Sequence, residues 1–258
     1  MSLGLLHEVV LGLTGDRLAA RAIQVCLHTF SFPQPMMLGM ELSDVMRTTG
    51  AVRRFTDDPL PDDVLERILD NARFAPTGGN RQGSHVIVVR DVQTRKTLAD
   101  LSVTGARRYT AQVKNGEFPW NPTKPMKVTP EEVAATEAGP YLPFVYCSAV
   151  LVVCVDLNVC AAFDQHLDRV GLIAGASVYP FVWNILLAAR NEGFGGALAT
   201  VTVAEEPRVK ELLGIPEDYA VAALLPIGKP VKQVHKLTRK PVSEIATRDR
   251  FDGEPFRA

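Results

Sequence analysis

The sequence predicts an α+β protein in which helices and strands intermix around one central sheet. Residues 61–75 place apolar side chains at helical spacing, with Leu65, Ile68 and Ala72 on one face. Residues 148–157 instead read "SAVLVVCVDL", a continuous apolar run that is typical of a strand buried on both faces. A chain of 258 residues with 47% hydrophobic content can enclose one large core, so we expect one main domain.

The composition excludes two classes of partner. Lys and Arg number 28 and Asp and Glu number 29, so the whole chain has no strong field toward nucleic acid or an acidic membrane surface. Any anion site must therefore be local. Residues 1–30 carry charges throughout and resemble neither a signal peptide nor a membrane span. The four cysteines lack the spacing of a zinc or redox motif, which favours a cytoplasmic protein.

Two parts are expected along the chain. Residues 1–39 are predicted to be an N-terminal appendage of unknown role, because they include the proline-rich "SFPQPMMLG" and show no clear period. Met40 then opens "MELSDVMRTTGAVRRF", which is typical of the start of a domain. We therefore expect residues 40–258 to form the domain and Met40 to be its natural or ancestral start.

The first half of this domain begins with the helix at 61–75, where Pro61 suits the first turn. The connector "FAPTGGNRQG" at 74–83 follows, with far more glycine and amide side chains than a plain connector needs. It leads into "HVIVV" at 85–89, a short strand rich in β-branched residues, and a further helix is predicted at 92–102.

Residues 105–146 are predicted to form a lid. The segment contains six prolines and several aromatic residues, and within it Thr129 and Glu132 have the spacing of a helix capping box. Linkers rarely contain so many aromatic residues. An ordered surface excursion packed by its own aromatic side chains is an equally good interpretation.

The second half follows the strand at 148–157. Residues 170–193 are too apolar for a surface helix and contain Pro180, so we expect a kinked or split helix in the core or at a subunit interface. A strand is then expected at 194–203, a short helix ending at Gly214 and another strand at 220–230. The basic segment 232–251 is expected to be an extended tail.

Several kinds of chemistry are poorly supported. The glycines of "GFGGALA" follow a helix rather than a strand, so they do not fit a dinucleotide-binding fingerprint, and no GxxxxGK[ST] loop occurs. The five histidines lack metal-ligand spacing, and no serine lies in a GxSxG elbow. We therefore expect no metal site and no classical hydrolase site.

Three separate segments could bind a ligand. "RTTGAVRR" places Arg47, Arg53 and Arg54 near a helix end, where guanidinium groups could hold a phosphate. "KLTRKP" adds Arg239 between two lysines. Taken alone, each basic segment is also consistent with a solvated surface. The third segment is the connector at 74–83.

The order of these segments resembles the nitroreductase family, flavoproteins that hold FMN and take electrons from NADH or NADPH. The resemblance rests on "AVRRFTDDPLPDDVLERILDNARFAPTGGNRQGSHVIVV", on "ASVYPFVWNILLAARNEGFGGALAT", and on "LLPIGKP" with "RKPVSE". It covers roughly residues 40 to 250. It implies a central mixed β-sheet flanked by helices, in an intertwined homodimer with a C-terminal extension.

The resemblance also implies which residues bind FMN. Arg53 and Arg239 would clamp the phosphate, with Arg47 as a third contact. Leu198, Ala199 and Thr200 would pass the reactive edge of the ring, where the backbone N–H of Thr200 would stabilise the reduced flavin. The connector would line the flavin largely from the partner subunit, through Pro76, Thr77, Gly78, Asn80 and Gln82.

Two departures from the family pattern are visible. An Arg-Arg-Ser-like triplet is common where this chain has Thr49, Gly50 and Ala51, so its phosphate site depends more on the remaining arginines. After Gln82 the usual Pro-Trp is replaced by Gly83 and Ser84, which removes a rigid turn and an aromatic wall.

The expected function is hydride transfer from NAD(P)H through FMN to a nitroaromatic, quinone or similar acceptor in a ping-pong cycle. No protein residue would be catalytic, because the flavin carries the chemistry. Phe118 and Trp120 in the lid would stack on the acceptor, although ordinary lid packing explains them equally well. The alternatives are a flavin-cleaving or reductive dehalogenase-type enzyme on the same scaffold and a non-catalytic flavin-binding or storage protein.

Overall fold

The computed structural model describes residues 40–257. The predicted appendage at 1–39 therefore lies outside the described residues. The described part begins with α3 (Leu42–Thr48), a short helix that follows Met40. Among the described residues, no helix combines the length and the apolar character needed to cross a membrane.

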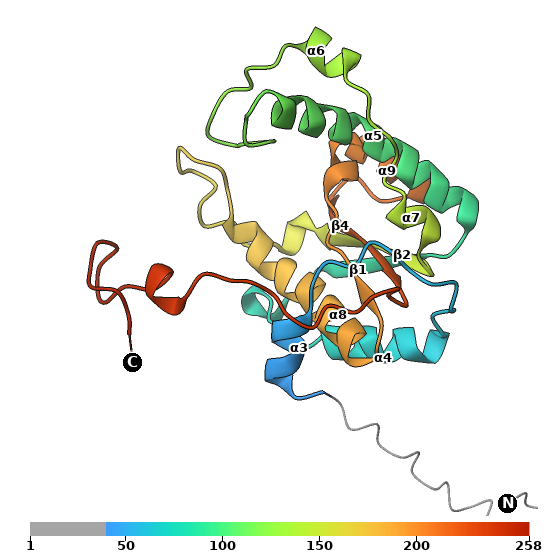
Figure 1. The fold of residues 1–258 in the computed structure, drawn as a ribbon, viewed down its shortest axis with the longest axis horizontal. Helices are drawn as coiled ribbons and strands as arrows, with labels where there is room; N and C mark the ends of the chain where they lie inside the picture. The colour runs from blue at the N-terminus through green and yellow to red at the C-terminus, as the bar shows by residue number, and fades with distance from the viewer. Residues whose placement is uncertain (1–39, 258) are drawn as a thin grey trace, which may run out of the picture. The chain divides into compact units, whose positions relative to one another are not determined.

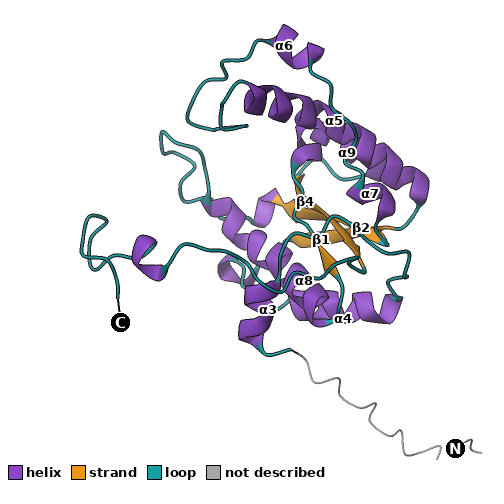
Figure 2. Cartoon of the chain, in the orientation of Figure 1, coloured by secondary structure: helices purple, strands orange, loops and turns teal. Residues whose placement is uncertain are grey.

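The core is a four-stranded sheet with helices on both faces (Figures 1 and 2). Its strands are β1 (Ser84–Val89), β2 (Ala149–Asp156), β3 (Gly195–Gly196) and β4 (Tyr219–Gly228), in the order β1-β2-β4-β3. All three pairings are antiparallel. The expectation of a mixed sheet is therefore wrong for the described residues, because none of these strands runs parallel to its neighbour.

Strand β2 lies between β1 and β4, and its apolar residues are all buried, as its sequence predicts. Its alternating side chains supply two separate cores. Leu151, Val153 and Val155 pack with residues of α4 (Asp62–Ala72) and α8 (Tyr179–Asn191). Val150, Val152 and Cys154 pack with residues of α5 (Val92–Lys114), α7 (Pro143–Tyr146) and α9 (Glu206–Leu213).

Helix α4 confirms the helix predicted from periodicity. Leu65, Ile68 and Ala72 face the core, and Asp62 and Asp63 lie in the first turn, where negative charge is favourable. Pro61 is the residue before the first turn rather than part of it.

Helix α5 is much longer than the predicted 92–102, so the first ten residues assigned to the lid are helical. The side chain of Asp91 caps its N-terminus by accepting a 2.7 Å hydrogen bond from the N–H of Thr94. Gly105 lies inside this helix and is buried against the backbone of Val201. The rest of the predicted lid contains α6 (Pro130–Ala135), which begins with the expected Thr129–Glu132 capping box.

The apolar segment at 170–193 is split. Residues Ile173–Ser177 form a 3-10 turn, η3, and α8 begins at Tyr179 with Pro180 in its first turn. Pro180 therefore opens a helix instead of kinking one, because a proline at this position removes no helical hydrogen bond.

The strand expected at 194–203 is wrong for most of its length. Only β3 pairs continuously, Ala199 forms one isolated bridge with Leu224, and Val201–Glu205 form a 3-10 turn, η4. Gly195 and Gly196 allow close packing, since a Cβ on Gly196 would lie 2.5 Å from the carbonyl oxygen of Pro226. Helix α9 ends at Gly214 in the left-handed conformation, as predicted.

After β4 the chain returns along the start of the domain and then extends away from it, as Figure 1 shows in red. The N–H of Val231 donates to the carbonyl of Arg54, and the N–H of Thr56 donates to the carbonyl of Lys229. The described residues of the tail beyond 238 contain a 3-10 turn, η5 (Val242–Glu244), and one bridge between Thr247 and Pro255. The tail is extended, as its composition predicts.

Candidate functional site

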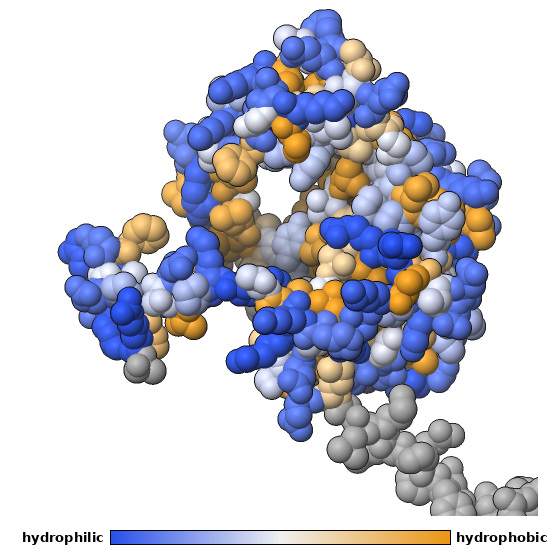
Figure 3. All heavy atoms as spheres, in the orientation of Figure 1, coloured by the Kyte–Doolittle hydropathy of each residue, from blue (hydrophilic) through white to orange (hydrophobic). Residues whose placement is uncertain are grey.

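A cavity of about 710 Å³ lies between α5, η4 and the segment that follows α5. Five of the residues singled out in the sequence line it, although they are far apart in the chain: Arg53, Trp120, Leu198, Ala199 and Thr200. Figure 3 shows a hollow on this face, beside α5 and the 115–142 segment, with apolar atoms along its rim. The structure therefore joins the predicted phosphate-binding, flavin-edge and lid segments at one pocket.

Arg53 reaches this pocket because its neighbours are fixed to the sheet. Val52 is buried, and its N–H donates a 2.8 Å hydrogen bond to the carbonyl of Gly196. The Arg53 side chain is exposed and donates from Nε to the hydroxyl of Tyr141 at 3.1 Å. Its two terminal nitrogens form no hydrogen bond with other described residues, so they are available for an oxyanion.

Thr200 presents an unpaired backbone donor to the same pocket. Its neighbour Ala199 exchanges two hydrogen bonds with Leu224, at 3.1 and 2.9 Å. Because successive N–H groups along an extended segment point in opposite directions, the N–H of Thr200 faces away from Leu224. It forms no hydrogen bond with any described residue. Thr200 is exposed, so this donor is open to a ligand in the pocket.

Trp120 forms an ordered wall of the pocket. The guanidinium carbon of Arg108 lies 3.9 Å from the centre of the Trp120 ring, and the indole nitrogen donates to the carbonyl of Gly105 at 3.3 Å. The N–H of Trp120 donates to the side chain of Gln112 at 3.0 Å. These contacts hold the residue at a φ of 52°, which is uncommon for a bulky side chain.

Glu117 anchors the segment next to Trp120. Its carboxylate accepts from the Asn115 side chain at 2.9 Å and from the backbone N–H groups of Lys127 and Val128, both at 3.1 Å. The hydrogen bond from Asn115 is the largest of the causes that lower the pKa of Glu117 to about 2. Phe118 is not at the main pocket: it is 79% exposed and borders a separate cavity of about 190 Å³.

The connector at 74–83 is tightly turned. Gly79, Asn80 and Gln82 have φ values of 61°, 54° and 52°, and the left-handed region is unusual for Gln82 in particular. The N–H of Gln82 donates to the hydroxyl of Thr77 at 3.0 Å. The N–H of Gly78 donates to the hydroxyl of Ser177 at 3.2 Å, which ties the loop to η3. Strained backbone of this kind clusters at functional sites.

Packing explains a glycine at residue 83, where the resemblance leads us to expect a proline. A Cβ at this position would lie 2.4 Å from a methyl carbon of Val159, and its carbonyl accepts a hydrogen bond from the N–H of Asp156. Any larger residue would therefore have to displace the turn after β2. The departure at Gly83 is accommodated by its neighbours in this chain.

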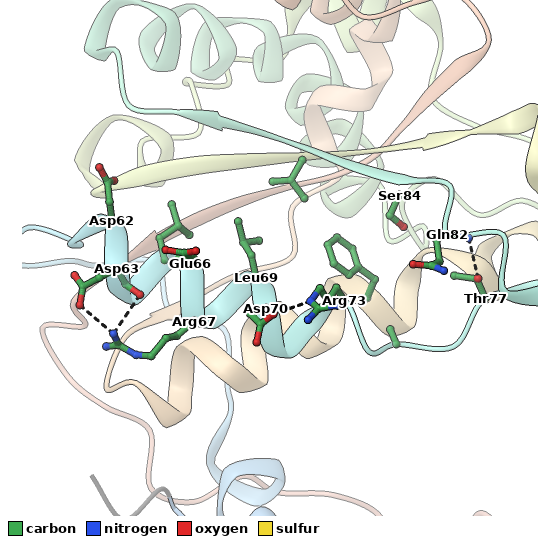
Figure 4. A pocket seen from close by; sticks show the side chains of 14 residues that line it. Asp62, Asp63, Glu66, Arg67, Leu69, Asp70, Arg73, Thr77, Gln82 and Ser84 are labelled. Carbon is green, nitrogen blue, oxygen red and sulfur yellow. Dashed lines mark hydrogen bonds and ion pairs between the residues drawn. The ribbon is translucent and has the colours of Figure 1, made fainter. Parts of the chain in front are cut away.

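The connector does not reach the pocket that contains Arg53. Thr77 and Gln82 instead line a second pocket of about 860 Å³ beside α4 (Figure 4). Pro76, Gly78 and Asn80 are exposed, and neither pocket includes them in its wall. Within one chain the predicted cofactor residues therefore form two groups.

Arg47 and Arg239, the other two arginines predicted to bind the phosphate, do not line the Arg53 pocket. Arg47 is exposed in the last turn of α3. Arg239 is exposed in the tail and donates to the carbonyl of its neighbour Thr238 at 2.8 Å. A Cβ on Gly50 would lie 3.2 Å from Leu237, so the tail crosses the predicted phosphate segment just before Arg239.

Some residues of the pocket were not predicted to have a role. Tyr141, Tyr109 and Arg108 were visible only as part of an aromatic and basic segment. Ser177 carries no signal in the sequence, because its contact with Gly78 joins residues 99 positions apart.

The chemistry of the Arg53 pocket suits a flat anionic cofactor. Free guanidinium nitrogens can bind phosphate oxygens, an unpaired backbone N–H can donate to a ring edge, and aromatic side chains can cover a ring face. These three features occur together at the pocket lined by Arg53, Thr200 and Trp120.

Comparison with known proteins agrees with the family resemblance seen in the sequence. The family model described as "Nitroreductase family" matches residues 46–229. A relative from Archaeoglobus fulgidus, named an NADH dehydrogenase/NAD(P)H nitroreductase, is 28% identical over 202 residues, which cover 74% of this chain and 86% of the relative. An iodotyrosine deiodinase from Nematostella vectensis is 27% identical over 205 residues, covering 78% of this chain and 72% of the relative.

Solved structures share the fold. Nitroreductase A from Vibrio parahaemolyticus matches with a TM-score of 0.60 and 20% identity, over 83% of this chain and 77% of that one. An iodotyrosine deiodinase bound to FMN and 3-iodo-L-tyrosine matches with a TM-score of 0.60 and 19% identity, over 82% of this chain and 100% of that one. The NADPH:FMN oxidoreductase from Vibrio harveyi, complexed with NAD+, matches with a TM-score of 0.59 and 20% identity, over 82% and 78% of the two chains.

Proposed function

This chain belongs to the nitroreductase family of oxidoreductases, and from that premise we propose that it binds FMN and passes electrons from NAD(P)H to a nitroaromatic, quinone or similar acceptor. The observation that carries the proposal is the meeting of Arg53 and the unpaired N–H of Thr200 at one pocket. Both groups are exposed and keep donors free of other described residues, so a cofactor in this pocket can accept hydrogen bonds from them.

Each group at this pocket has a proposed task. Arg53 binds the FMN phosphate, and Arg239 completes the clamp because the tail crosses the Gly50 segment just before it. Arg47 supplies a third cation from α3. The N–H of Thr200 donates to the ring edge, while the Trp120 ring, held by Arg108, closes one side of the acceptor space. FMN, when bound, supplies the chemistry by accepting a hydride from the nicotinamide and reducing the acceptor in a second half-reaction.

We propose further that a second copy of the chain completes the site. The connector at 76–82 is strained and exposed, yet it lies at a different pocket from Arg53. In a homodimer, the Thr77, Asn80 and Gln82 groups of one protomer would reach the Arg53 pocket of the other. Exposed apolar side chains on α8 and the tail, including Trp183 and Ile245, are available to be covered by such a partner.

An anaerobic titration tests the electron-transfer step. Full-length protein loaded with FMN is mixed with NADPH or NADH, and the long-wavelength flavin absorbance is followed. We expect at least one nicotinamide to bleach the flavin and a quinone to restore its colour. A flavin that neither nicotinamide reduces would contradict the proposed oxidoreductase function and would favour a flavin-storage protein.

Reductive dehalogenation is the second candidate. It is favoured by the relative from Nematostella vectensis, which is named an iodotyrosine deiodinase and covers most of this chain. Anaerobic incubation of the reduced protein with 3-iodotyrosine distinguishes the two functions. Release of iodide with loss of the iodinated substrate supports dehalogenation, whereas reduction of a nitroaromatic without iodide release supports the first proposal.

A further inference from the structure

The hydroxyl of Tyr141 lies at the Arg53 pocket and has no task in the electron transfer proposed above. Nε of Arg53 donates to this hydroxyl at 3.1 Å, so the hydroxyl oxygen is the acceptor. A phenol also carries one O–H donor, and the Tyr141 hydroxyl donates to none of the residues that the structure describes. Tyr141 therefore presents a free donor beside the guanidinium group.

The backbone and the ring of Tyr141 are both held in place. Its N–H donates to the hydroxyl of the buried Ser102 at 2.8 Å, and Ser102 donates in turn to the carbonyl of Ala99 in α5 at 2.6 Å. The Tyr141 ring packs edge-to-face on the buried Phe144, with the ring centres 4.9 Å apart. Because these contacts restrict the side chain, the hydroxyl is held ready for a ligand.

The contact with Tyr141 leaves the rest of the Arg53 guanidinium group open to an oxyanion. In a guanidinium group, the Nε–H bond and one N–H bond of a terminal nitrogen are parallel, so two acceptor oxygens can bind side by side. The Tyr141 hydroxyl takes the Nε position. An oxyanion oxygen at the terminal nitrogen would therefore lie next to this hydroxyl and within reach of its O–H.

The sequence indicates why a tyrosine hydroxyl is useful at this place. The resemblance to the family leads us to expect a serine hydroxyl where this chain has Ala51. The hydroxyls of Thr48 and Thr49 do not replace it, because they donate to backbone carbonyls of α3 at 2.6 and 2.7 Å. The Tyr141 hydroxyl supplies the donor that this segment lacks.

We propose that Tyr141 is a binding residue for the FMN phosphate and the positioning residue for Arg53. Its oxygen holds Nε, so the terminal nitrogens of Arg53 face the phosphate, and its O–H donates to a neighbouring phosphate oxygen. This assignment rests on the proposed binding of FMN. It adds a phosphate ligand from the end of the lid segment, where the sequence indicates no basic residue.

Fluorescence titration of the full-length apoprotein with FMN and with riboflavin, which has the same ring but no phosphate, tests the assignment. Tyr141→Phe keeps the ring that packs on Phe144 and removes only the hydroxyl. We expect it to weaken FMN binding by about tenfold and to leave riboflavin affinity within about threefold of the original. Tyr146→Phe is the matched control and should change neither affinity, because Tyr146 is exposed and does not line the Arg53 pocket.

Adding Tyr141→Phe to Arg53→Ala tests the positioning role. Because Tyr141 is proposed to act partly through Arg53, the further loss of FMN affinity should be about threefold or less. A further loss of about tenfold, as large as in the original background, would overturn that role.

Unchanged FMN affinity in Tyr141→Phe, or an equal loss of FMN and riboflavin affinity, would overturn the phosphate contact. If the original protein binds FMN in these cases, the proposed function stands and only the assignment of Tyr141 fails. An original protein that binds no FMN would instead contradict the proposed function itself.

Discussion

Gly105 and Val201 meet so closely that a Cβ on residue 105 would lie 2.3 Å from the carbonyl oxygen of residue 201. This contact packs α5 directly against η4. Both elements line the pocket, through Tyr109 of α5 and Thr200 just before η4. The width of the proposed flavin site therefore depends on the absence of a side chain at residue 105.

Gly105→Ala should destabilise the protein by about 1–3 kcal/mol through overpacking. Alanine alone favours a helix over glycine by about 1 kcal/mol, so the sign of the change separates the two effects. Urea unfolding measures the change in the free energy of unfolding. Gly139→Ala is the control, because a Cβ there meets nothing within 4 Å. A Gly105→Ala variant more stable than the original protein by about 1 kcal/mol would show that α5 moves away from η4 at almost no cost.

Arg53→Ala and Arg239→Ala should each weaken FMN binding by about ten- to a hundredfold. A hydrogen bond to a charged group is worth about 1.5–3 kcal/mol, and both guanidinium groups are proposed to bind the same phosphate. Fluorescence titration of the apoprotein with FMN gives the dissociation constants. Arg208→Ala is the matched control, since Arg208 makes only an exposed pair with Glu205 at 3.8 Å. Unchanged affinity in either variant would remove that arginine from the clamp.

Mixed dimers test whether the connector acts on the other protomer. Chains with Arg53→Ala and chains with Asn80→Ala plus Gln82→Ala are co-expressed and the mixed species is purified through two different tags. If each site combines Arg53 of one protomer with the connector of its partner, the mixed dimer has one intact site and retains FMN there. If both groups act within one chain, both sites of the mixed dimer are damaged and it binds FMN no better than the parent variants.

Acid should release the segment around Trp120. The pKa of Glu117 is lowered from 4.5 to about 2, chiefly by the hydrogen bond from Asn115. A lowered folded-state pKa means that the stabilisation is present above pH 4.5 and is lost as the pH falls toward 2. In a Trp183→Phe background, where Trp120 is the remaining tryptophan, its fluorescence should change across this window. Glu117→Gln should abolish that change, and an identical pH profile in this variant would exclude Glu117 as the anchor.

Local patterns were sufficient to predict much of the fold. Helix α4 follows from the spacing of Leu65, Ile68 and Ala72, and β2 follows from an apolar run whose two faces are both covered. The segments that meet at the Arg53 pocket were indicated by their order along the chain, because each basic segment taken alone is also consistent with a solvated surface.

The errors came from contacts between distant residues. The helix predicted at 92–102 continues to Lys114, through Gly105, which packs against the backbone of Val201. The segment at 194–203 suggested a strand, but its two glycines pack against Val52 and Pro226, and the chain then turns into η4. Phe118 and Trp120 were indistinguishable in sequence. Only Trp120 has Arg108 and Gln112 placed to hold it at the pocket.

Equilibrium titration of the full-length apoprotein with FMN tests the central claim most directly. The account predicts a yellow complex with one FMN per chain, whose affinity falls in Arg53→Ala but not in Arg208→Ala. A colourless protein that takes up no added FMN would contradict the assignment of the Arg53 and Thr200 pocket as a flavin site.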